Sequence, residues 1–466
     1  MDLTSPGPRI TGHGHYLAEA RELLRLALPL AATQLAQMVI LATDTLMLGH
    51  YSKSALAAAA IGNTVFFFLW LLGSGPVSAV SPMVAHVVGQ DAATATRDVR
   101  VVVRMGLWAV ALMSPPLLAL LIFTRPVLVF LHQEPALAAD AALYTGVLAA
   151  GLPCSLAFQV LRNFSTALNR PMAPLLVMGA AVLFNAAADY VLIFGHLGLS
   201  KLGLVGAGLA SASSNLFTLI AMSLIALFTP GLRAYRVAHR FFRPHWDSIA
   251  ELFRLGVPMS VTMIFEMALF NGATLVMGTF GIAALAAHQI ALTIPSLTFM
   301  IPLGIGLAAT VRVGQAAGAG DAVAARRAGF TAMGVGVIFM GAMALLLLAA
   351  PRAIATLWLP DIPENADVLA LAVVFLHVAA AFQLMDGLQV TASMSLRGLK
   401  DAAGPMWLAG ASYWLAGAPM SVFLGFGLGM KGLGIWLGLA FGLLVAAVTL
   451  TTRFAILSKR PAPMGQ

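Results

Sequence analysis

Charged residues are scarce in this sequence of 466 residues. Asp, Glu, Lys and Arg make up 9% of it, whereas 60% of the residues are hydrophobic. Soluble domains carry about 25% charged residues, so the composition excludes a water-soluble protein. It also excludes an intrinsically disordered chain and a long coiled coil, because both depend on many charged side chains.

Cysteine is nearly absent. Cys154 stands alone and has no partner within the chain for a disulfide, which excludes a disulfide-stabilised secreted scaffold. The polar residues 1–26 lack the apolar core of a secretory signal peptide, and we expect them to form a cytoplasmic lead-in. The formal net charge is +8, but the basic residues are spread along the chain rather than gathered in one patch, so we expect no nucleic-acid partner.

Long apolar segments are what the sequence has instead. The hydrocarbon core of a bilayer is about 30 Å thick and needs roughly 20 apolar residues per helix. Polar, glycine and proline residues separate twelve such segments, which predicts an all-α membrane protein with twelve transmembrane helices. Their approximate limits are 27–48, 58–84, 99–123, 139–163, 174–195, 203–228, 253–278, 287–311, 328–350, 367–393, 405–427 and 433–456.

The basic residues predict the orientation, because cytoplasmic flanks of membrane proteins hold the excess of Lys and Arg. When the connections are assigned to alternate sides, every Lys and Arg falls on one side except Lys53, Arg125, Lys201, Arg352 and Lys431. Both termini are then predicted to be cytoplasmic. We expect a multi-pass protein of a bacterial-type cytoplasmic (inner) membrane.

The strongest interruption is the basic and aromatic segment 229–252, which we interpret as an amphipathic linker at the membrane interface rather than a site for a specific partner. It divides the chain into an N-lobe of six helices, 27–228, and a C-lobe of six helices, 253–456. Residues 457–466 form a predicted cytoplasmic tail.

The two lobes repeat one another. The triplet VGQ occurs at 88–90 and again at 313–315, each time after the second helix of a lobe. Pro29 and Pro258 open the first helix of each lobe at an offset of 229 residues. Six helices separate the copies, so both run in the same direction. Two pseudo-symmetric lobes of this kind are typical of transporters with a cavity between them.

Four acidic residues lie inside the predicted spans: Asp44, Asp189, Glu266 and Asp386. A charge at the centre of a bilayer costs about 2.5–3.5 kcal/mol even on insertion scales. No cationic residue is obviously at a matching depth, so the acids are either protonated or neutralised by a cation from outside the chain. The structural alternative is a carboxylic acid that is hydrogen-bonded to a neighbouring helix.

Two of these acids share a depth. Asp44 and Asp189 lie about 25 and 23 Å above the starts of their helices, and Asn185 is one turn from Asp189 on the same face. Ser211 adds a hydroxyl near that level. Two carboxylates, an amide and a hydroxyl are hard oxygen ligands, which suit Na⁺ or proton exchange. We therefore expect a cation site in the N-lobe.

The other lobe carries its acids at different heights, so we expect two unlike sites. Glu266 corresponds by the repeat offset to Gln37. His288, followed by Gln289, opens the eighth helix and is expected to be a hydrogen-bonding anchor, with cavity lining as the alternative. Met263 belongs to a cluster of Met and Phe residues that either lines an adaptable drug surface or packs between helices.

Enzymatic signatures are missing. The sequence GAGD at 318–321 matches a motif of membrane aspartyl proteases, but it falls in a polar turn that the repeat aligns with residues 89–100. No HExxH, Walker A or GxSxG pattern is present. We expect neither an enzyme nor a cofactor other than a coupling ion.

Several of these motifs resemble the multidrug and toxic compound extrusion family, and in particular its NorM-type branch. The resemblance runs from about residue 20 to 455. It rests on AAHQ at 286–289, RVGQ at 312–315, FE at 265–266, MD at 385–386 and SLRG at 395–398.

The resemblance implies twelve helices in two six-helix lobes and export of cationic drugs in exchange for Na⁺ or H⁺. We expect the protein to be a monomer. The resemblance places Glu266 and Asp386 at the coupling-cation site of the C-lobe, and the Asp44 cluster, with Asn185, Asp189 and Ser211, at that of the N-lobe. NorM-type proteins often carry Tyr four residues before the tenth-helix acid, where this chain has Phe382. That departure leaves both Na⁺ and proton coupling open.

Two alternatives remain. A flippase of lipid-linked oligosaccharides with related architecture is expected to line its cavity with cations that hold a pyrophosphate. A membrane-embedded enzyme is disfavoured because no pair of acids comes with a recognised catalytic motif.

Overall fold

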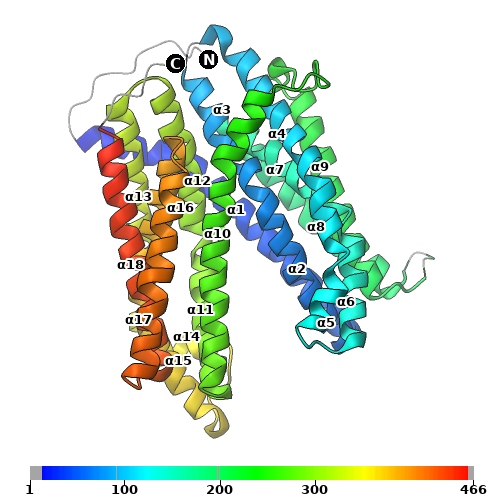
Figure 1. The fold of residues 1–466 in the computed structure, drawn as a ribbon, viewed down its shortest axis with the longest axis vertical. Coiled ribbons are helices and arrows are strands. Elements are labelled where there is room, and N and C mark those ends of the chain that lie inside the picture. Colours follow the sequence, from blue (N-terminus) through cyan, green and yellow to red (C-terminus); the bar gives the residue numbers. More distant parts are fainter. Residues whose placement is uncertain (1–12, 91, 197, 199, 460–466) are drawn as a thin grey trace.

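The computed structural model describes residues 13–90, 92–196, 198 and 200–459. Its regular elements within these residues are all helices, which confirms the all-α membrane fold (Figure 1). The first half contains α1 (His13–Tyr51), α2 (Lys53–Ser78), α3 (Val80–Gly89), α4 (Ala92–Leu121), α5 (Thr124–Phe130), α6 (Pro135–Leu148), α7 (Gly151–Ala167), α8 (Met172–Phe194) and α9 (Leu204–Phe228).

The second half follows a short helix of the linker, η1 (Arg233–Tyr235). It contains α10 (Trp246–Thr279), α11 (Ile282–Thr298), α12 (Met300–Gly318), α13 (Ala322–Ala349), α14 (Pro351–Thr356), η2 (Pro363–Asn365), α15 (Ala366–Gly398), α16 (Ala403–Ala411), η3 (Ser412–Gly417), α17 (Ala418–Val422), η4 (Phe423–Gly427) and α18 (Lys431–Leu457).

The number of spans depends on how broken helices are counted. Ten helical segments of the described chain are long and apolar enough to cross a bilayer, or eleven if α6 and α7, which meet at 45°, form one span. The predicted span 405–427 is helical but alternates between α and π geometry, in α16, η3, α17 and η4. Helices therefore stand at all twelve predicted positions, while the count of twelve spans stays a prediction.

The two halves approach each other at the end of the molecule that carries the linker, here called the linker end. In Figure 1 the helices α4–α9 lie to the right and α13–α18 to the left, while α5 and α14 lie apart at the bottom. Helix α1 packs on α8 of its own half and on α12 of the other, and α10 packs on α2. The residue limits of the two lobes stay predictions.

Backbone contact joins α2 to α10 near the linker end. A Cβ atom added to Gly75 would lie 2.2 Å from the carbonyl oxygen of Gly256, and one added to Gly256 would lie 2.1 Å from Cα of Pro76. The hydroxyl of Ser260 accepts a hydrogen bond from the backbone nitrogen of Gly75 at 3.1 Å. Glycine is required on both helices because any side chain would separate them.

A second contact joins α12 to the first half at the same end. A Cβ atom on Gly89 would lie 2.0 Å from the carbonyl oxygen of Gln315, whose side-chain amide donates to the carbonyl of Ala167 at 2.9 Å. Arg312 forms a bidentate ion pair with Glu19 of α1, with a shortest distance of 2.7 Å. The linker end is thus closed by glycine contacts and a partly buried ion pair.

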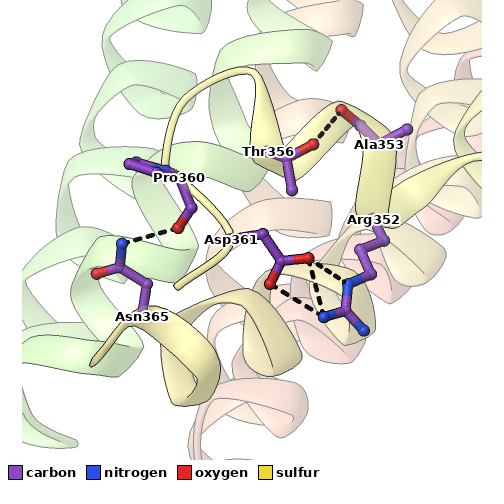
Figure 2. Close-up of polar contacts among 6 residues, drawn as sticks. All are labelled: Arg352, Ala353, Thr356, Pro360, Asp361 and Asn365. Atoms are coloured by element: carbon purple, nitrogen blue, oxygen red, sulfur yellow. Dashed lines mark hydrogen bonds and ion pairs between the residues drawn. The ribbon is translucent and has the colours of Figure 1, made fainter. Parts of the chain in front are cut away.

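At the opposite end a short loop between α14 and α15 is fixed by polar contacts (Figure 2). Arg352 donates from Nη2 and Nε to the carboxylate of Asp361 at 3.0 and 3.1 Å. Asn365 donates to the carbonyl of Pro360 at 2.9 Å. Both members of the ion pair are largely exposed, so this contact orders the loop more than it stabilises the fold.

Candidate functional site

The four predicted polar residues of the N-lobe come together inside the first half. Asp44 lies on α1, Asn185 and Asp189 on α8, and Ser211 on α9. The Ser211 hydroxyl donates to Oδ2 of Asp44 at 2.8 Å, and the side chains of Asp189 and Asn185 also lie beside Asp44. Asp44 is 5% exposed and Asp189 is 0% exposed. The sequence arithmetic on depth is therefore matched by a buried cluster, while its role as a cation site stays a prediction.

Helix packing brings this cluster together. Asn185 and Asp189 are four residues apart and face the same side of α8. Helix α8 packs against both α1 and α9. Its approach to α9 is close at Gly206, where an added Cβ atom would lie 2.4 Å from the carbonyl oxygen of Leu192. A small residue at the start of α9 thus lets the two helices carry their polar side chains to the same place.

Five polar atoms of this cluster have no hydrogen-bond partner among the described residues. They are Asp44 Oδ1, the Oδ1 and Nδ2 atoms of Asn185, and both carboxylate oxygens of Asp189. Burial of a polar group without a partner costs about 1–3 kcal/mol, and more for a charged group. Four of the five atoms are oxygens, which can bind a hard cation or accept protons. They cannot pair with further hydrogen-bond acceptors.

Sequence reasoning missed Tyr144 of α6. Its ring is fully buried, and its hydroxyl donates to Oδ1 of Asn63 on α2 at 3.3 Å. The hydroxyl also lies near Asp44 and Ser211. Neither Tyr144 nor Asn63 carries a charge, so neither stood out among the residues of the predicted spans. The one sequence feature that could have indicated this contact is Asn63, a polar residue in an apolar span. Polar side chains from α2 and α6 therefore lie next to the cluster as well.

The C-lobe residues form a different arrangement. Asp386 of α15 is buried, Glu266 of α10 is partly buried, and each lies within electrostatic reach of the other. Gln389, one turn along α15, donates from Nε2 to the hydroxyl of Tyr413 on η3. Asp386 Oδ1 and Gln389 Oε1 have no partner among the described residues. The two acids belong to different helices and have the phenol of Tyr413 as a common neighbour.

Tyr413 was also missed by sequence reasoning. It lies near both Glu266 and Asp386. Phe382, which stands where NorM-type proteins often have Tyr, is instead packed between the rings of Phe270 and Trp436 at centroid distances of 5.8 and 5.7 Å. A phenol hydroxyl is therefore supplied to the C-lobe acids from η3.

A buried cation accompanies these acids. Arg397 follows Asp386, Gln389 and Ser393 along one face of α15, at spacings that place all four on one stripe. It is 7% exposed and acts electrostatically on Glu266 and Tyr413.

A buried positive charge thus lies within electrostatic reach of Glu266, although Arg397 is 11 residues, or about 16 Å along α15, from Asp386. The expectation that no cation matches the acids in depth stays a prediction. Arg397 was assigned to a cytoplasmic flank from its place in the sequence, as was Arg162 of α7. Arg162 is also buried, and its Nη1 donates to Oε1 of Gln34 on α1 at 3.0 Å. Position along the chain gave the correct end of the helix but could not show that both side chains turn inward.

The remaining predicted residues are placed as follows. His288 is buried, exchanges a hydrogen bond of 3.1 Å with the hydroxyl of Thr274 and packs edge-on against Trp436. This geometry agrees with a hydrogen-bonding anchor. Gln37 and Met263 are partly buried, and Gln289 is exposed.

Comparison with known proteins shows to which family the chain belongs. The MatE family model matches residues 29–191 and 258–423. "Probable multidrug resistance protein NorM" of Brucella suis is 41% identical over 448 residues, which is 96% of this chain and 95% of that protein. The protein of the same description from Mesorhizobium japonicum is 40% identical, with 94% and 93% covered.

Solved structures agree with this at the level of the fold. The crystal structure of the eukaryotic MATE transporter AtDTX14 superposes with a TM-score of 0.84 at 22% identity, covering 96% of this chain and 99% of that one. The family match extends over both repeats, and the relatives are matched along nearly their whole length. The chain therefore belongs to the multidrug and toxic compound extrusion (MATE) family of membrane transporters, in its NorM-type branch.

Proposed function

We propose that this protein is a secondary active antiporter of a bacterial inner membrane that exports cationic or amphiphilic organic compounds in exchange for Na⁺ or H⁺. Both termini lie in the cytoplasm in this proposal. The buried cluster around Asp44 carries it, because four oxygen atoms there have no hydrogen-bond partner among the described residues. The names of the NorM relatives as multidrug resistance proteins support the class of substrate.

The N-lobe cluster binds the coupling cation. Two neighbouring buried carboxylates repel each other when both are ionised, and a proton or a Na⁺ ion between them removes that repulsion. The Asn185 amide and the Ser211 hydroxyl complete an oxygen-rich set around Asp44 and Asp189. Because neither a thiol nor an imidazole belongs to the set, it suits hard cations.

The C-lobe acids couple drug binding to cation binding. Glu266 is partly buried and provides a negative charge for a cationic drug or for the coupling cation, but not for both at once. Asp386, Gln389 and Tyr413 hold the surrounding polar network. Arg397 provides a positive charge near Glu266 that favours release of either cation. Competition for one carboxylate then links the two fluxes.

In alternating access, the site at which drug and cation compete is exposed first to one side of the membrane and then to the other. The contacts of Gly75 with Gly256 and of Gly89 with Gln315 close the linker end in this structure, which is the predicted cytoplasmic end. Opening that end requires these backbone contacts to separate while the halves rotate. One elementary charge moving through 100 mV supplies about 2.3 kcal/mol, which is enough to drive useful accumulation.

A lipid-linked oligosaccharide flippase is the alternative. Three buried arginines of the described chain would favour it, Arg104, Arg162 and Arg397. Arg104 donates to the linker carbonyl of Arg240. Arg162 donates to Gln34, and Arg397 lies near Glu266, so both are already engaged by groups of this chain. Acids inside the spans remain the stronger feature, and they favour a cationic substrate.

Efflux assays test the proposal. Cells expressing the wild type, Asp44→Asn, Glu266→Gln or Asp386→Asn are loaded with ethidium or norfloxacin, with protein levels matched in the membrane. We expect each variant to lose most of the efflux. Asp140→Asn is the control, because Asp140 is exposed on α6 and undergoes the same chemical change. Full efflux in all three variants would overturn the coupling model.

Gradient experiments identify the ion. Purified protein in vesicles is given an imposed Na⁺ gradient at constant pH, or an imposed pH gradient without Na⁺. Efflux driven by the pH gradient alone excludes obligatory Na⁺ coupling, and efflux driven by the Na⁺ gradient alone excludes obligatory proton coupling. Efflux that responds to neither gradient contradicts the antiport mechanism.

A further inference from the structure

A basic cavity lies at the linker end, outside the two acidic clusters. It has a volume of about 580 Å³ and is bounded by α3, α4, the linker, the start of α10 and the loop after α15. Asp98 and Glu251 are its acidic residues, and His239 and His245 also line it. Its cationic residues are Arg97, Arg100, Arg104, Arg240, Arg243 and Lys400.

The sequence showed that the linker is basic but did not place it against the basic start of α4. Its basic residues are spread along the chain, but the linker folds back over α4 and brings two basic segments together. Six of the 26 Lys and Arg residues thus lie around one cavity, while the others are spread over the rest of the chain. With six cations and two acids, the cavity has a formal charge of +4 when its histidines are neutral.

Three residues on one face of α4 hold the linker in place. Arg100 donates from Nε to the carbonyl of Tyr235 at 2.7 Å, and Arg104 donates from Nη1 to the carbonyl of Arg240 at 2.8 Å. Trp108 donates from its indole nitrogen to the carbonyl of Phe241 at 2.8 Å. These donors are spaced four residues apart along the helix, so each turn fixes one part of the linker.

Arg104 has one donor atom without a partner in the described chain, although its Nη1 bonds to the linker. It is 6% exposed, and its Nε has no hydrogen-bond partner among the described residues, although the side chain lines the cavity. Its charged neighbours are Arg100, Arg240 and Arg243, which all repel it. A buried guanidinium among like charges is costly unless an anion compensates it. The cavity therefore has the charge, the volume and the unpaired donor of an anion site.

We propose that this cavity binds an anionic phosphate group, carried by a membrane phospholipid or by a soluble phosphate compound. Arginine forks match the geometry of phosphate oxygens and bind them bidentately. The exposed aromatic side chains of Phe242, at 85%, and Trp246, at 62%, adjoin the lining residues. Aromatic residues of this kind sit at the level of lipid headgroups, where basic pockets meet anionic lipids.

Both halves of the molecule contribute to the lining of the cavity. The lining comes from α3 and α4 of the first half and from α10 and Lys400 of the second, and Lys400 forms an ion pair with Glu251 at 2.8 Å. A ligand held by both sides stabilises the state in which the linker end is closed. The affinity of the closed state for phosphate then exceeds that of the state in which the linker end is open.

Matched double variants test the site. Arg240→Gln with Arg243→Gln removes two lining charges, whereas Arg233→Gln with Arg236→Gln removes two exposed charges of the same linker that do not line the cavity. Each pair also contains one residue with a left-handed backbone, Arg240 or Arg236. The full-length protein is purified in a neutral detergent, and its thermal unfolding is followed with phosphatidylglycerol, phosphatidylcholine or inorganic pyrophosphate added.

We expect phosphatidylglycerol to raise Tm of the wild type and of the control pair more than phosphatidylcholine does. The double variant Arg240→Gln with Arg243→Gln, here called the lining pair, should bind phosphatidylglycerol roughly thirtyfold more weakly, at about fivefold per arginine. It should lose most of the increase in Tm. The same pattern with pyrophosphate identifies a soluble phosphate as the ligand and also supports the site. Equal shifts in the two double variants, or no shift with either ligand, overturn the proposal.

A second measurement guards against misfolding of the lining pair. Arg243→Gln alone leaves Arg240 and its neighbours unchanged, and bound phosphatidylglycerol is counted by native mass spectrometry. An affinity between those of the wild type and the lining pair supports the site. An affinity equal to that of the wild type, in a folded protein, contradicts it.

Discussion

The hydroxyl of Ser211 donates a hydrogen bond of 2.8 Å to Oδ2 of Asp44, across the boundary between α9 and α1. This contact leaves Oδ1 of the same carboxylate without a partner among the described residues. One oxygen is thus held in place by the protein while the other is available to a cation. The orientation of the carboxylate is fixed before the cation arrives.

Ser211→Ala removes that hydrogen bond and keeps both carboxylates. Because hydrogen bonds to charged groups contribute about 1.5–3 kcal/mol, we expect the half-saturating concentration of the coupling cation to rise roughly tenfold or more, with drug binding little changed. Cation-dependent efflux in vesicles measures it. Ser213→Ala is the control, because the Ser213 hydroxyl donates to the backbone carbonyl of Ala210. Equal cation dependence in both variants would contradict an orienting role.

Two glycines test the packing around Tyr144. A Cβ atom at Gly62 would lie 2.7 Å from the Tyr144 ring and 2.8 Å from the Thr145 hydroxyl, whereas one at Gly179 meets nothing within 4 Å. We expect Gly62→Ala to destabilise the protein by about 1–3 kcal/mol through overpacking, and Gly179→Ala to be neutral or stabilising by up to about 1 kcal/mol. Thermal unfolding in detergent distinguishes them. A loss of stability at Gly179 alone would show that the two environments are misassigned.

Arg397→Gln removes the buried positive charge near Glu266. Since that charge opposes cation binding at the carboxylate, we expect tighter binding of the coupling cation and slower release, so that both its half-saturating concentration and the maximal efflux rate fall. Efflux is measured against the external cation concentration. Arg254→Gln removes an exposed charge from α10 and should leave both quantities unchanged. An unchanged cation dependence in Arg397→Gln would mean that Arg397 has a packing role alone.

Two of the bidentate arginine pairs, Arg352 with Asp361 and Arg312 with Glu19, should differ in their contribution to stability. Asp361→Asn weakens an exposed pair with Arg352 and should change stability little, with almost no effect remaining in high salt. Glu19→Gln leaves the less exposed Arg312 without its carboxylate and should cost several times more. Unfolding of both variants is compared at low and high ionic strength. Similar losses for the two would show that burial of Arg312 has no energetic effect.

The fold class was predictable because its cause is local. Apolar segments long enough to cross a bilayer must be helical, since the backbone finds no hydrogen-bond partner in lipid. The breaks between α2 and α3 and within residues 403–427 were not predicted, because helix geometry there depends on neighbouring helices. Gly417, for example, packs against Gly442 of α18 with an added Cβ atom only 3.0 Å from its Cα.

The proximity of the N-lobe residues was also predictable. Asp44 and Asp189 each carry a cost in an apolar span, and the rise per residue of a helix fixes their depth. The roles of Tyr144, Tyr413 and Arg397 were not visible, because rotation of a helix about its axis is decided by packing. The basic cavity was missed for a similar reason, since it exists only when the linker folds over α4.

The contact between Gly75 and Gly256 has a consequence for how the halves separate. Backbone that rests on backbone has no rotamers to rearrange, so it cannot loosen by degrees as side chains do. A small rotation of α10 against α2 either keeps this contact or breaks it entirely, together with the hydrogen bond from Gly75 to Ser260. The linker end should therefore open in an all-or-none manner, with few intermediate states through which ions leak.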